Sequence, residues 1–429
     1  MIGIGGAGMS AYALAAHALG AAVTGSDGAR SPYSERLRDA TGIHTLLGHR
    51  PENLPAGDGL EVCYSSAVAY ENPERAAARS RGLRELSRGA LLGEISALKR
   101  TIAIAGAHGK TTTACMVAHI LSGCGMDPSY LIGGVLRSTG TNAAWGSGEW
   151  LVIEADESDR SMLELRPEIA LVTNIELDHH ATYRTFDELS EVFAAFLAKA
   201  PIAVLHDEPQ LLALRHGESV LYSVEGLELH GGESSFSWRG EQVRLALAGA
   251  HNALNATGAL EAARLAGAPQ DAARRALASF SGAARRFELL GRSSAGALIY
   301  SDYAHHPTEV SATLQAARAL TSGRLVAVFQ PHLYSRTAAL AGDFAAALAK
   351  ADLVMVLDVY PARERREDWP QVSGALIARA IAERGVDVRF APSLKDGQQT
   401  LEGLLVDGDL AMLMGAGDID TLARTLTAA

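Results

Sequence analysis

An apolar strand that leads through a loop into a helix is the pattern that most constrains the fold of this sequence. We predict a short strand over residues 1–4, then a glycine turn and a helix over about 10–19. The same order recurs where a strand over 101–105 runs into glycines and a helix that begins at Lys110, and where a strand over 324–329 precedes an alanine-rich helix. Such alternation is typical of parallel sheets wrapped by helices, so the predicted fold class is α/β.

The length of the chain predicts several domains. At 429 residues it exceeds what one hydrophobic core usually supports, and about 150 residues per domain indicates three. We place the domains at residues 1–98, 99–284 and 285–429. The first boundary precedes the strand of the second glycine loop, and the second boundary is marked only by serine and glycine breakers.

Composition excludes several classes of protein. A hydrophobic content of 48% is that of a folded chain, and a net charge of −11 provides no positive field for nucleic acid. The cysteines are too few and too scattered for a disulfide framework or a zinc site. Residues 1–26 carry no charged side chain, but glycines interrupt them and they have no basic segment at their start. We therefore predict a cytoplasmic protein that binds neither membrane nor nucleic acid.

The loop after the strand at 101–105 is the strongest sign of a nucleotide triphosphate site. Gly106 and Gly109 let backbone N–H groups converge on phosphate oxygens, Lys110 can bridge phosphates, and Thr111 can bind magnesium. The loop is shorter than the general P-loop pattern, so a chance turn is the alternative. The strand before it and the helix after it favour nucleotide binding.

A second glycine cluster stands at the start of the chain, in Gly3-Ile-Gly5-Gly6-Ala-Gly8-Met9-Ser10, with Asp27 further on. This spacing is close to a dinucleotide fingerprint, although the glycines could simply allow a strand and a helix to pack closely. Together with the ATP loop, the cluster predicts a site for the diphosphate of a second nucleotide ligand.

Carboxylates follow two apolar strands after the ATP loop. The first group is Glu154, Asp156, Glu157 and Asp159. Magnesium prefers hard oxygen ligands and takes only one or two protein carboxylates, so Glu154 is the favoured ligand. The second group, in Asn174-Ile-Glu-Leu-Asp-His, could face the same metal, with His179 as a ligand or as a group that orients phosphate.

Histidines follow two predicted strands in the last third of the chain. His305 and His306 come after the first, and His332 comes after the second. Ligands bind at this edge of open parallel sheets. A metal site built from these three histidines and a pocket for an amino acid are both compatible with the sequence.

Six segments resemble the Mur ligases and occur in the order in which that family has them. They are Gly106-Ala-His-Gly-Lys-Thr-Thr, Glu154-Ala-Asp-Glu-Ser-Asp, Asn174-Ile-Glu-Leu-Asp-His, His251-Asn-Ala-Leu-Asn255, Asp302-Tyr-Ala-His-His-Pro-Thr-Glu and Phe329-Gln-Pro-His. The resemblance implies a Rossmann-like N-terminal domain for a UDP-sugar, a central P-loop ATPase domain with a mostly parallel sheet, and a Rossmann-like C-terminal domain for an amino acid.

The resemblance also implies roles for individual residues. The UDP-sugar would be held by Gly5, Gly6, Ala7, Gly8, Met9, Ser10, Asp27, His49, Ser65 and Ser66. ATP would be held by Gly106, Ala107, His108, Gly109, Lys110, Thr111, Thr112, His251, Asn252 and Asn255. Magnesium would be held by Thr111, Glu154 and His179, and catalysis would use Lys110, Glu154, His179, Arg286 and Asp302. The acceptor amino acid would meet His305, His332 and Arg336.

The activity implied is an ATP- and Mg²⁺-dependent ligation in peptidoglycan precursor synthesis that joins L-alanine to the carboxylate of UDP-N-acetylmuramic acid through an acyl phosphate. We expect a monomer or a weak homodimer. Alternatives are a recycling ligase that adds a tripeptide, a dinucleotide-dependent oxidoreductase, and a non-catalytic UDP-sugar-binding protein. Tyr303 and Glu309 favour the alanine enzyme over the recycling ligase. An oxidoreductase or a non-catalytic binding protein would leave the loop at Lys110 and the carboxylates after it unexplained.

Overall fold

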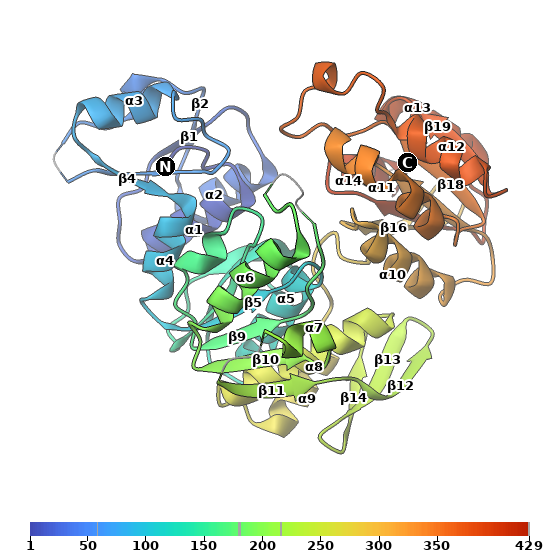
Figure 1. Cartoon of the computed structure of the whole chain (residues 1–429), viewed down its shortest axis with the longest axis horizontal. Helices are drawn as coiled ribbons and strands as arrows, with labels where there is room; N and C mark the ends of the chain where they lie inside the picture. Colours follow the sequence, from blue (N-terminus) through green and yellow to red (C-terminus); the bar gives the residue numbers. More distant parts are fainter. Residues whose placement is uncertain (58, 179–181, 215–216, 428–429) are drawn as a thin grey trace. The chain divides into compact units, whose positions relative to one another are not determined.

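The computed structural model describes residues 1–57, 59–178, 182–214 and 217–427. The chain forms two compact units, Met1–Val224 with Leu254–Phe280, and Glu225–Ala253 with Ser281–Ala429. Figure 1 gives the labels of the helices and strands.

The first unit contains a seven-stranded sheet in the order β11-β10-β9-β5-β8-β6-β7. All neighbouring strands are parallel except the pair β6 and β7. The strands are β5 (Arg100–Ala105), β6 (Ser129–Leu136), β7 (Thr141–Ala144), β8 (Trp150–Glu154), β9 (Ile169–Val172), β10 (Ile202–His206) and β11 (Glu218–Tyr222). Because β5, β8 and β9 are central, both faces of each are covered and their sequences are almost continuously apolar.

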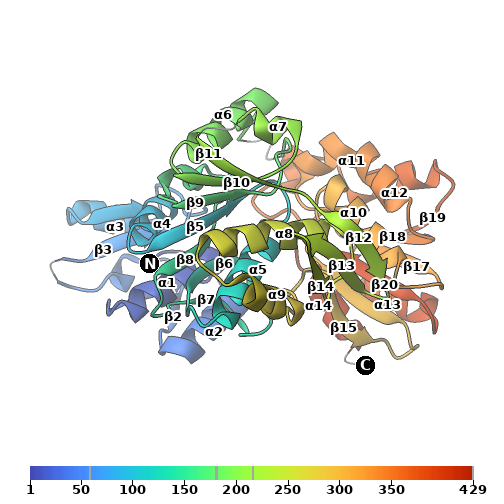
Figure 2. The ribbon, with the colours of Figure 1, turned by 90° about the horizontal axis from the view of Figure 1, so that it is seen from below.

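Helices cover both faces of this sheet. They are α5 (Lys110–Gly123), α6 (Phe186–Leu197), α7 (Pro209–Leu212), α8 (Ala250–Leu265) and α9 (Gln270–Ala278). Figure 2 shows α6 and α7 on one side and α5, α8 and α9 on the other. Phe193 and Phe196 of α6 are fully buried in one core with Ala103 of β5 and Ile153 of β8.

The start of the chain forms short parallel ladders, β1 (Gly25–Asp27) with β2 (Thr45–Leu47) and β3 (Glu61–Tyr64) with β4 (Arg84–Ser87). The predicted strand over residues 1–4 is wrong, because only Ile2 pairs, through single bridges to Ser26 and Tyr64. Gly3 has a φ of +80°, which ends the extended backbone there. The helices of this part are α1 (Ala7–Ala18), α2 (Pro32–Thr41), α3 (Pro73–Ser80) and α4 (Arg88–Ser96), and the 3-10 turns are η1 (Pro51–Asn53) and η2 (Ser161–Glu164).

The second unit contains a six-stranded sheet in the order β15-β16-β20-β17-β18-β19, parallel except for the pair β15 and β16. Its strands are β15 (Glu288–Arg292), β16 (Leu298–Asp302), β17 (Leu325–Phe329), β18 (Leu353–Leu357), β19 (Asp387–Ala391) and β20 (Leu410–Met414). A separate antiparallel sheet consists of β12 (Glu225–His230), β13 (Glu233–Trp238) and β14 (Glu241–Leu245).

Two apolar cores lie on the two faces of the six-stranded sheet. Val310, Phe344 and Ile377 from three different helices pack on one face, and Leu401 and Leu422 pack on the other. The helices are α10 (Pro307–Arg318), α11 (Tyr334–Leu348), α12 (Gly374–Ala382), α13 (Leu394–Leu404) and α14 (Ile419–Thr427), and the 3-10 turn is η3 (Arg366–Asp368). The predicted α/β class is confirmed. No helix in the described part of the chain has both the length and the apolar character needed to cross a membrane.

Candidate functional site

The loop between β5 and α5, here called the second glycine loop (residues 106–109), can only be built with glycine at two positions. Gly106 has a φ of +140°, and a Cβ there would lie 2.0 Å from the Thr173 hydroxyl oxygen. Gly109 has a φ of +81°, and its Cβ would lie 2.5 Å from Oδ1 of Asn255. The loop therefore passes directly against β9 and α8, and its backbone leads into the N-terminus of a helix of 14 residues.

Lys110, the first residue of α5, is held at this loop by a buried carboxylate. Its Nζ donates to both carboxylate oxygens of Glu157 at 2.9 Å, and also to the carbonyl oxygen of Gly106. Burial opposes the charge of the lysine, but Glu157, Asp156 and Glu154 outweigh it and raise its pKa above the ordinary value. Lys110 is therefore a fixed cation beside the glycine loop.

Glu154 and Thr111 bring hard oxygen atoms together at the same place. The Thr111 hydroxyl donates to Oε2 of Glu154 at 3.1 Å, and the Gly133 N–H donates to Oε1 at 2.6 Å. Adjacent oxygens around an octahedral magnesium ion with bonds of about 2.1 Å lie about 3 Å apart, so the pair fits two neighbouring magnesium ligands. His179, the third predicted ligand, lies outside the described residues.

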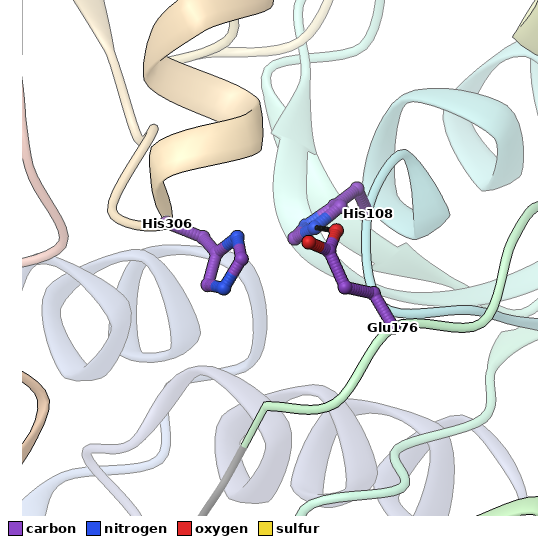
Figure 3. Close-up of side chains that lie close together, drawn as sticks. All are labelled: His108, Glu176 and His306. Atoms are coloured by element: carbon purple, nitrogen blue, oxygen red, sulfur yellow. Dashed lines mark hydrogen bonds and ion pairs between the residues drawn. The ribbon is translucent and has the colours of Figure 1, made fainter. Parts of the chain in front are cut away.

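The end of β9 supports the loop from the other side. Asn174 accepts a hydrogen bond from the His108 N–H at 2.9 Å and donates to the His108 carbonyl oxygen at 3.0 Å. The His108 ring nitrogen Nε2 lies 2.7 Å from Oε2 of Glu176, the pair drawn in Figure 3. Asn174 and Glu176 thus hold the second glycine loop in place. The sequence had suggested a different role for this segment, in which its side chains face the metal.

Helix α8 contributes the last group of ATP candidates. Asn255 is 7% exposed and lies against Gly109. In the second unit, Asn252 donates through Nδ2 to the Ala248 carbonyl oxygen at 2.7 Å, and burial lowers the pKa of His251 to about 4. Asn255 is the member of this group that the structure places at the second glycine loop.

The loop at the start of α1, here called the first glycine loop (residues 3–10), is fastened by Asp27. The Gly5 N–H donates to Oδ2 of Asp27 at 2.9 Å, and the Ser31 hydroxyl donates to the Gly5 carbonyl oxygen at 2.6 Å. Ser10 donates to the carbonyl oxygen of Ala7 at 3.0 Å, and Met9 is buried. Asp27 therefore fixes the loop itself, in addition to any contact with a ligand.

The other candidates of this part lie around the ladder ends. His49 contacts Glu74 through Nδ1 at 3.3 Å, and Glu74, only 2% exposed, also accepts from the Ser26 hydroxyl at 2.8 Å. Ser65 donates its backbone N–H to the Ile2 carbonyl oxygen at 3.0 Å, and Ser66 is exposed. Glu74 orients His49.

In the second unit, Asp302 is a buried acceptor at the end of β16. It accepts from the N–H groups of Phe287 at 2.6 Å and Ala304 at 2.7 Å. Burial raises its pKa to about 6, although the Arg286 charge and those two N–H groups act in the opposite direction. The Arg286 guanidinium lies 4.9 Å from the centre of the Tyr303 ring.

The histidines among the acceptor candidates of the same unit follow β16 and β17, which lie on either side of β20 in the sheet. The rings of His305 and His332 have centres 6.1 Å apart, and His332 stacks on Tyr360 with centres 5.8 Å apart. Arg336 is 5% exposed within α11. In the described part of the chain, the nitrogens of His305, His306 and His332 do not form a cluster within 4.8 Å, so the geometry gives no support to the three-histidine metal site.

Three Mur ligase domain families match successive parts of this chain. They are the Mur ligase family catalytic domain at residues 1–100, the Mur ligase middle domain at 104–263, and the Mur ligase glutamate ligase domain at 285–417. The UDP-N-acetylmuramate--L-alanine ligase of Saccharopolyspora erythraea is 42% identical over 100% of this chain and 92% of its own. The chain belongs to the Mur ligase family.

Further relatives share the whole length of this Mur ligase. The UDP-N-acetylmuramate--L-alanine ligase of Chlorobium phaeobacteroides is 40% identical over 99% of this chain and 96% of its own. The crystal structure of UDP-N-acetylmuramate-alanine ligase from Thermotoga maritima superposes with a TM-score of 0.86 at 27% identity, covering 100% of this chain and 97% of that one. A murein peptide ligase from Psychrobacter arcticus has a TM-score of 0.74 at 25% identity, with coverage of 100% and 97%.

The sequence assigned no role to three residues of this Mur ligase that its structure places beside predicted site residues. Glu157 holds Lys110, Glu74 holds His49, and Arg88 lies against Gly8. Glu157 stood among the carboxylates predicted after β8, but without a role of its own. Arg88 and Glu74 carried no local signal, since their partners lie far away in the sequence.

Proposed function

We propose that this Mur ligase joins L-alanine to the lactyl carboxylate of UDP-N-acetylmuramic acid, with cleavage of ATP to ADP and phosphate. The observation that carries the proposal is the arrangement at the end of β8, where Glu154 meets Thr111 and Glu157 meets Lys110 beside the second glycine loop. Likeness over the full length to relatives that bear the name of this activity supports the choice of substrates.

The assignment of residues follows the two glycine loops. ATP phosphates would bind at Gly106, Ala107, His108, Gly109, Lys110, Thr111 and Thr112, with His251, Asn252 and Asn255 toward the adenosine. The UDP-sugar would bind at the first glycine loop with Asp27, His49, Ser65 and Ser66. Arg286 and Asp302 would serve the nucleotide, and His305, His332 and Arg336 the L-alanine.

The proposed reaction has two steps. The muramic acid carboxylate attacks the γ-phosphorus of ATP, and the bond from this phosphorus to the β-phosphate oxygen breaks. ADP departs, and the carboxylate has become an acyl phosphate. The L-alanine amine then attacks the acyl carbon, loses a proton, and releases inorganic phosphate as the amide forms. Lys110 would neutralise charge on the transferring phosphoryl group, and the rigid loop would hold the reactants in line.

Thr111 and Glu154 would hold a magnesium ion, with His179 as a further ligand. When bound, the ion supplies positive charge to the β- and γ-phosphate oxygens. The fit rests on the hydroxyl and carboxylate oxygens 3.1 Å apart beside the phosphate loop.

The chain would function in the cytoplasm as a monomer or weak homodimer, without nucleic acid or membrane as partners. Domains at 1–98, 99–284 and 285–429 would carry the UDP-sugar, ATP and amino-acid sites respectively.

The test is release of inorganic phosphate from ATP and Mg²⁺ in the presence of UDP-N-acetylmuramic acid. L-alanine, the L-Ala-D-Glu-diamino acid tripeptide and no acceptor are compared. Release that requires L-alanine supports the proposal. Release only with tripeptide would favour the recycling ligase instead. This alternative is tested because the chain also resembles a murein peptide ligase. No release with either acceptor would overturn the assignment.

A further inference from the structure

We propose that Arg88 is a substrate-binding residue, which binds the diphosphate of the UDP-sugar through Nη1 while Nη2 holds the carboxylates after β8. The inference rests on the proposed function and adds to it a residue that joins the two glycine loops.

Arg88 is placed by the way α4 packs. Ser87 caps the helix by accepting from the Ala90 N–H, so Arg88 is its first residue. Gly89 and Gly93 lie on one face of α4, where added Cβ atoms would come within 3.1 Å of Ser161 and 2.7 Å of Glu164. These glycines allow α4 to approach η2 closely, which brings the Arg88 side chain to the end of β8.

One terminal nitrogen of the Arg88 guanidinium, Nη2, forms hydrogen bonds within the protein. Nη2 donates to Asp156 at 3.0 Å, to Asp159 at 3.0 Å and to the Ser161 hydroxyl at 3.3 Å. These carboxylates belong to the same short segment as Glu154 and Glu157, which hold Thr111 and Lys110. The segment after β8 therefore connects the cation of the first glycine loop to the cation of the second.

Nη1, the other terminal nitrogen of the guanidinium, lies beside the first glycine loop. Gly8 lies in the first turn of α1, and a Cβ added to it would be 3.1 Å from Nη1. Nε is buried, and among the residues that the structure describes it has no hydrogen-bond partner. All three hydrogen bonds from Arg88 to described residues use Nη2, so Nη1 beside Gly8 is available to an anionic oxygen. Nη1 and Nη2 are the two terminal nitrogens of the planar guanidinium, so Nη1 can bind a phosphate oxygen while Nη2 stays on the carboxylates.

The electrostatic surroundings keep Arg88 charged and in place. Burial opposes its charge, yet Tyr12, Asp156 and Asp159 raise its pKa above the ordinary value. The hydrogen bonds to Asp156 and Asp159 hold the guanidinium beside Gly8, so a phosphate group meets a fixed cation.

The experiment measures binding to the full-length chain by calorimetry without L-alanine. UDP-N-acetylmuramic acid, UDP and the Mg²⁺ complex of a non-hydrolysable ATP analogue are titrated separately into the wild type, Arg88→Ala and Arg88→Lys. We expect Arg88→Ala to weaken binding of both uridine diphosphates by about tenfold to a hundredfold, the loss for a charge-assisted hydrogen bond. The ATP analogue should bind nearly as in the wild type, and Arg88→Lys should recover part of the affinity because it keeps the charge but not the fork.

Two control variants separate ligand binding from structural support. Arg100→Ala removes an arginine that is also held by two carboxylates, those of Glu168 and Glu149. Arg100 begins β5, at the end of the strand away from the second glycine loop, so all three affinities should be unchanged. Asp159→Asn removes one partner of Arg88 but keeps the guanidinium, so UDP-sugar affinity should change far less than in Arg88→Ala. If Arg88→Ala does not fold, Arg88→Lys and Asp159→Asn decide between the two roles.

The possible outcomes are distinct. Equal UDP-sugar affinity in the wild type and both Arg88 variants would overturn the role of Arg88 and leave the proposed function intact. Equal losses for UDP-sugar and ATP analogue, matched by Asp159→Asn, would show structural support alone. If the Arg88 variants lose affinity for UDP-N-acetylmuramic acid but not for UDP, Arg88 contacts the lactyl carboxylate instead. That result would overturn the diphosphate assignment. A wild type that binds no UDP-sugar would overturn both proposals.

Discussion

Lys110 and Glu157 form a buried pair in which Nζ lies 2.9 Å from each carboxylate oxygen, with Glu157 only 2% exposed. They are 47 residues apart in sequence and are brought together because β5 and β8 are neighbouring parallel strands. The lysine proposed for phosphate binding is therefore already fixed by the protein. ATP phosphates would have to share this cation with Glu157.

Lys110→Met should lower phosphate release by about a hundredfold to a thousandfold, the usual effect of losing one preorganised group that stabilises charge in the transition state. It should also destabilise the fold by about 3 kcal/mol, because Glu157 is left buried without its cation. Adding Glu157→Gln should restore much of the thermal stability without restoring turnover. Steady-state phosphate release and thermal unfolding measure the two effects, and a double variant that regained turnover would contradict the role of Lys110.

Glu154→Ala should raise the magnesium concentration that gives half-maximal phosphate release by at least about tenfold, since the carboxylate oxygen beside Thr111 is lost. Chelation of the ion should stop turnover in the wild type. Asp159→Asn is the matched control, because Asp159 belongs to the same segment but bonds Arg88. The measurement is a magnesium titration at saturating ATP. An unchanged midpoint in Glu154→Ala would exclude Glu154 as a ligand.

Gly106→Ala and Gly109→Ala should each reduce ATP binding by more than about tenfold, because both need a positive φ and their Cβ atoms would collide with Thr173 and Asn255. Gly125→Ala is the control, since its φ is +74° but no atom lies within 4 Å of the added Cβ. It should cost only about 1 kcal/mol of stability and leave ATP affinity unchanged. Calorimetry with the ATP analogue tests this. Equal affinities in the three variants would show that the close approach of the loop has no bearing on ATP binding.

Asp302 should make stability depend on pH. Its pKa is raised from 3.8 to about 6 by burial, so the folded protein holds the proton more tightly than the unfolded chain. The stabilisation is complete below pH 3.8 and is lost as the pH rises through about 6. Relative to Asp302→Asn, the wild type should lose about 3 kcal/mol between about pH 4 and pH 7. Urea unfolding of both proteins across this range provides the measurement, and a constant difference would contradict the shifted pKa.

Local patterns in the sequence predicted much of the fold. The helix that begins at Lys110 and the strands over 101–105 and 324–329 agree with α5, β5 and β17 within a residue or so. Apolar periodicity and glycine loops act within a few residues of each other, so a sequence shows them directly. The opening segment was predicted less well, because the helix begins at Ala7 and residues 1–4 form only a bridge at Ile2. That pairing depends on Ser26 and Tyr64, which the local pattern does not include.

The sequence by itself determined the α/β class, the two glycine loops, and the carboxylates that end β8, because these depend on residue types at short spacing. Only the tertiary structure decided how the carboxylates are shared. Glu154 meets Thr111, Glu157 meets Lys110, and Asp156 and Asp159 meet Arg88. These partners are 43 to 71 residues apart. Which side chain meets which is set by the parallel order of the strands and by the close packing of α4 on η2, and neither is visible in the spacing of the motifs.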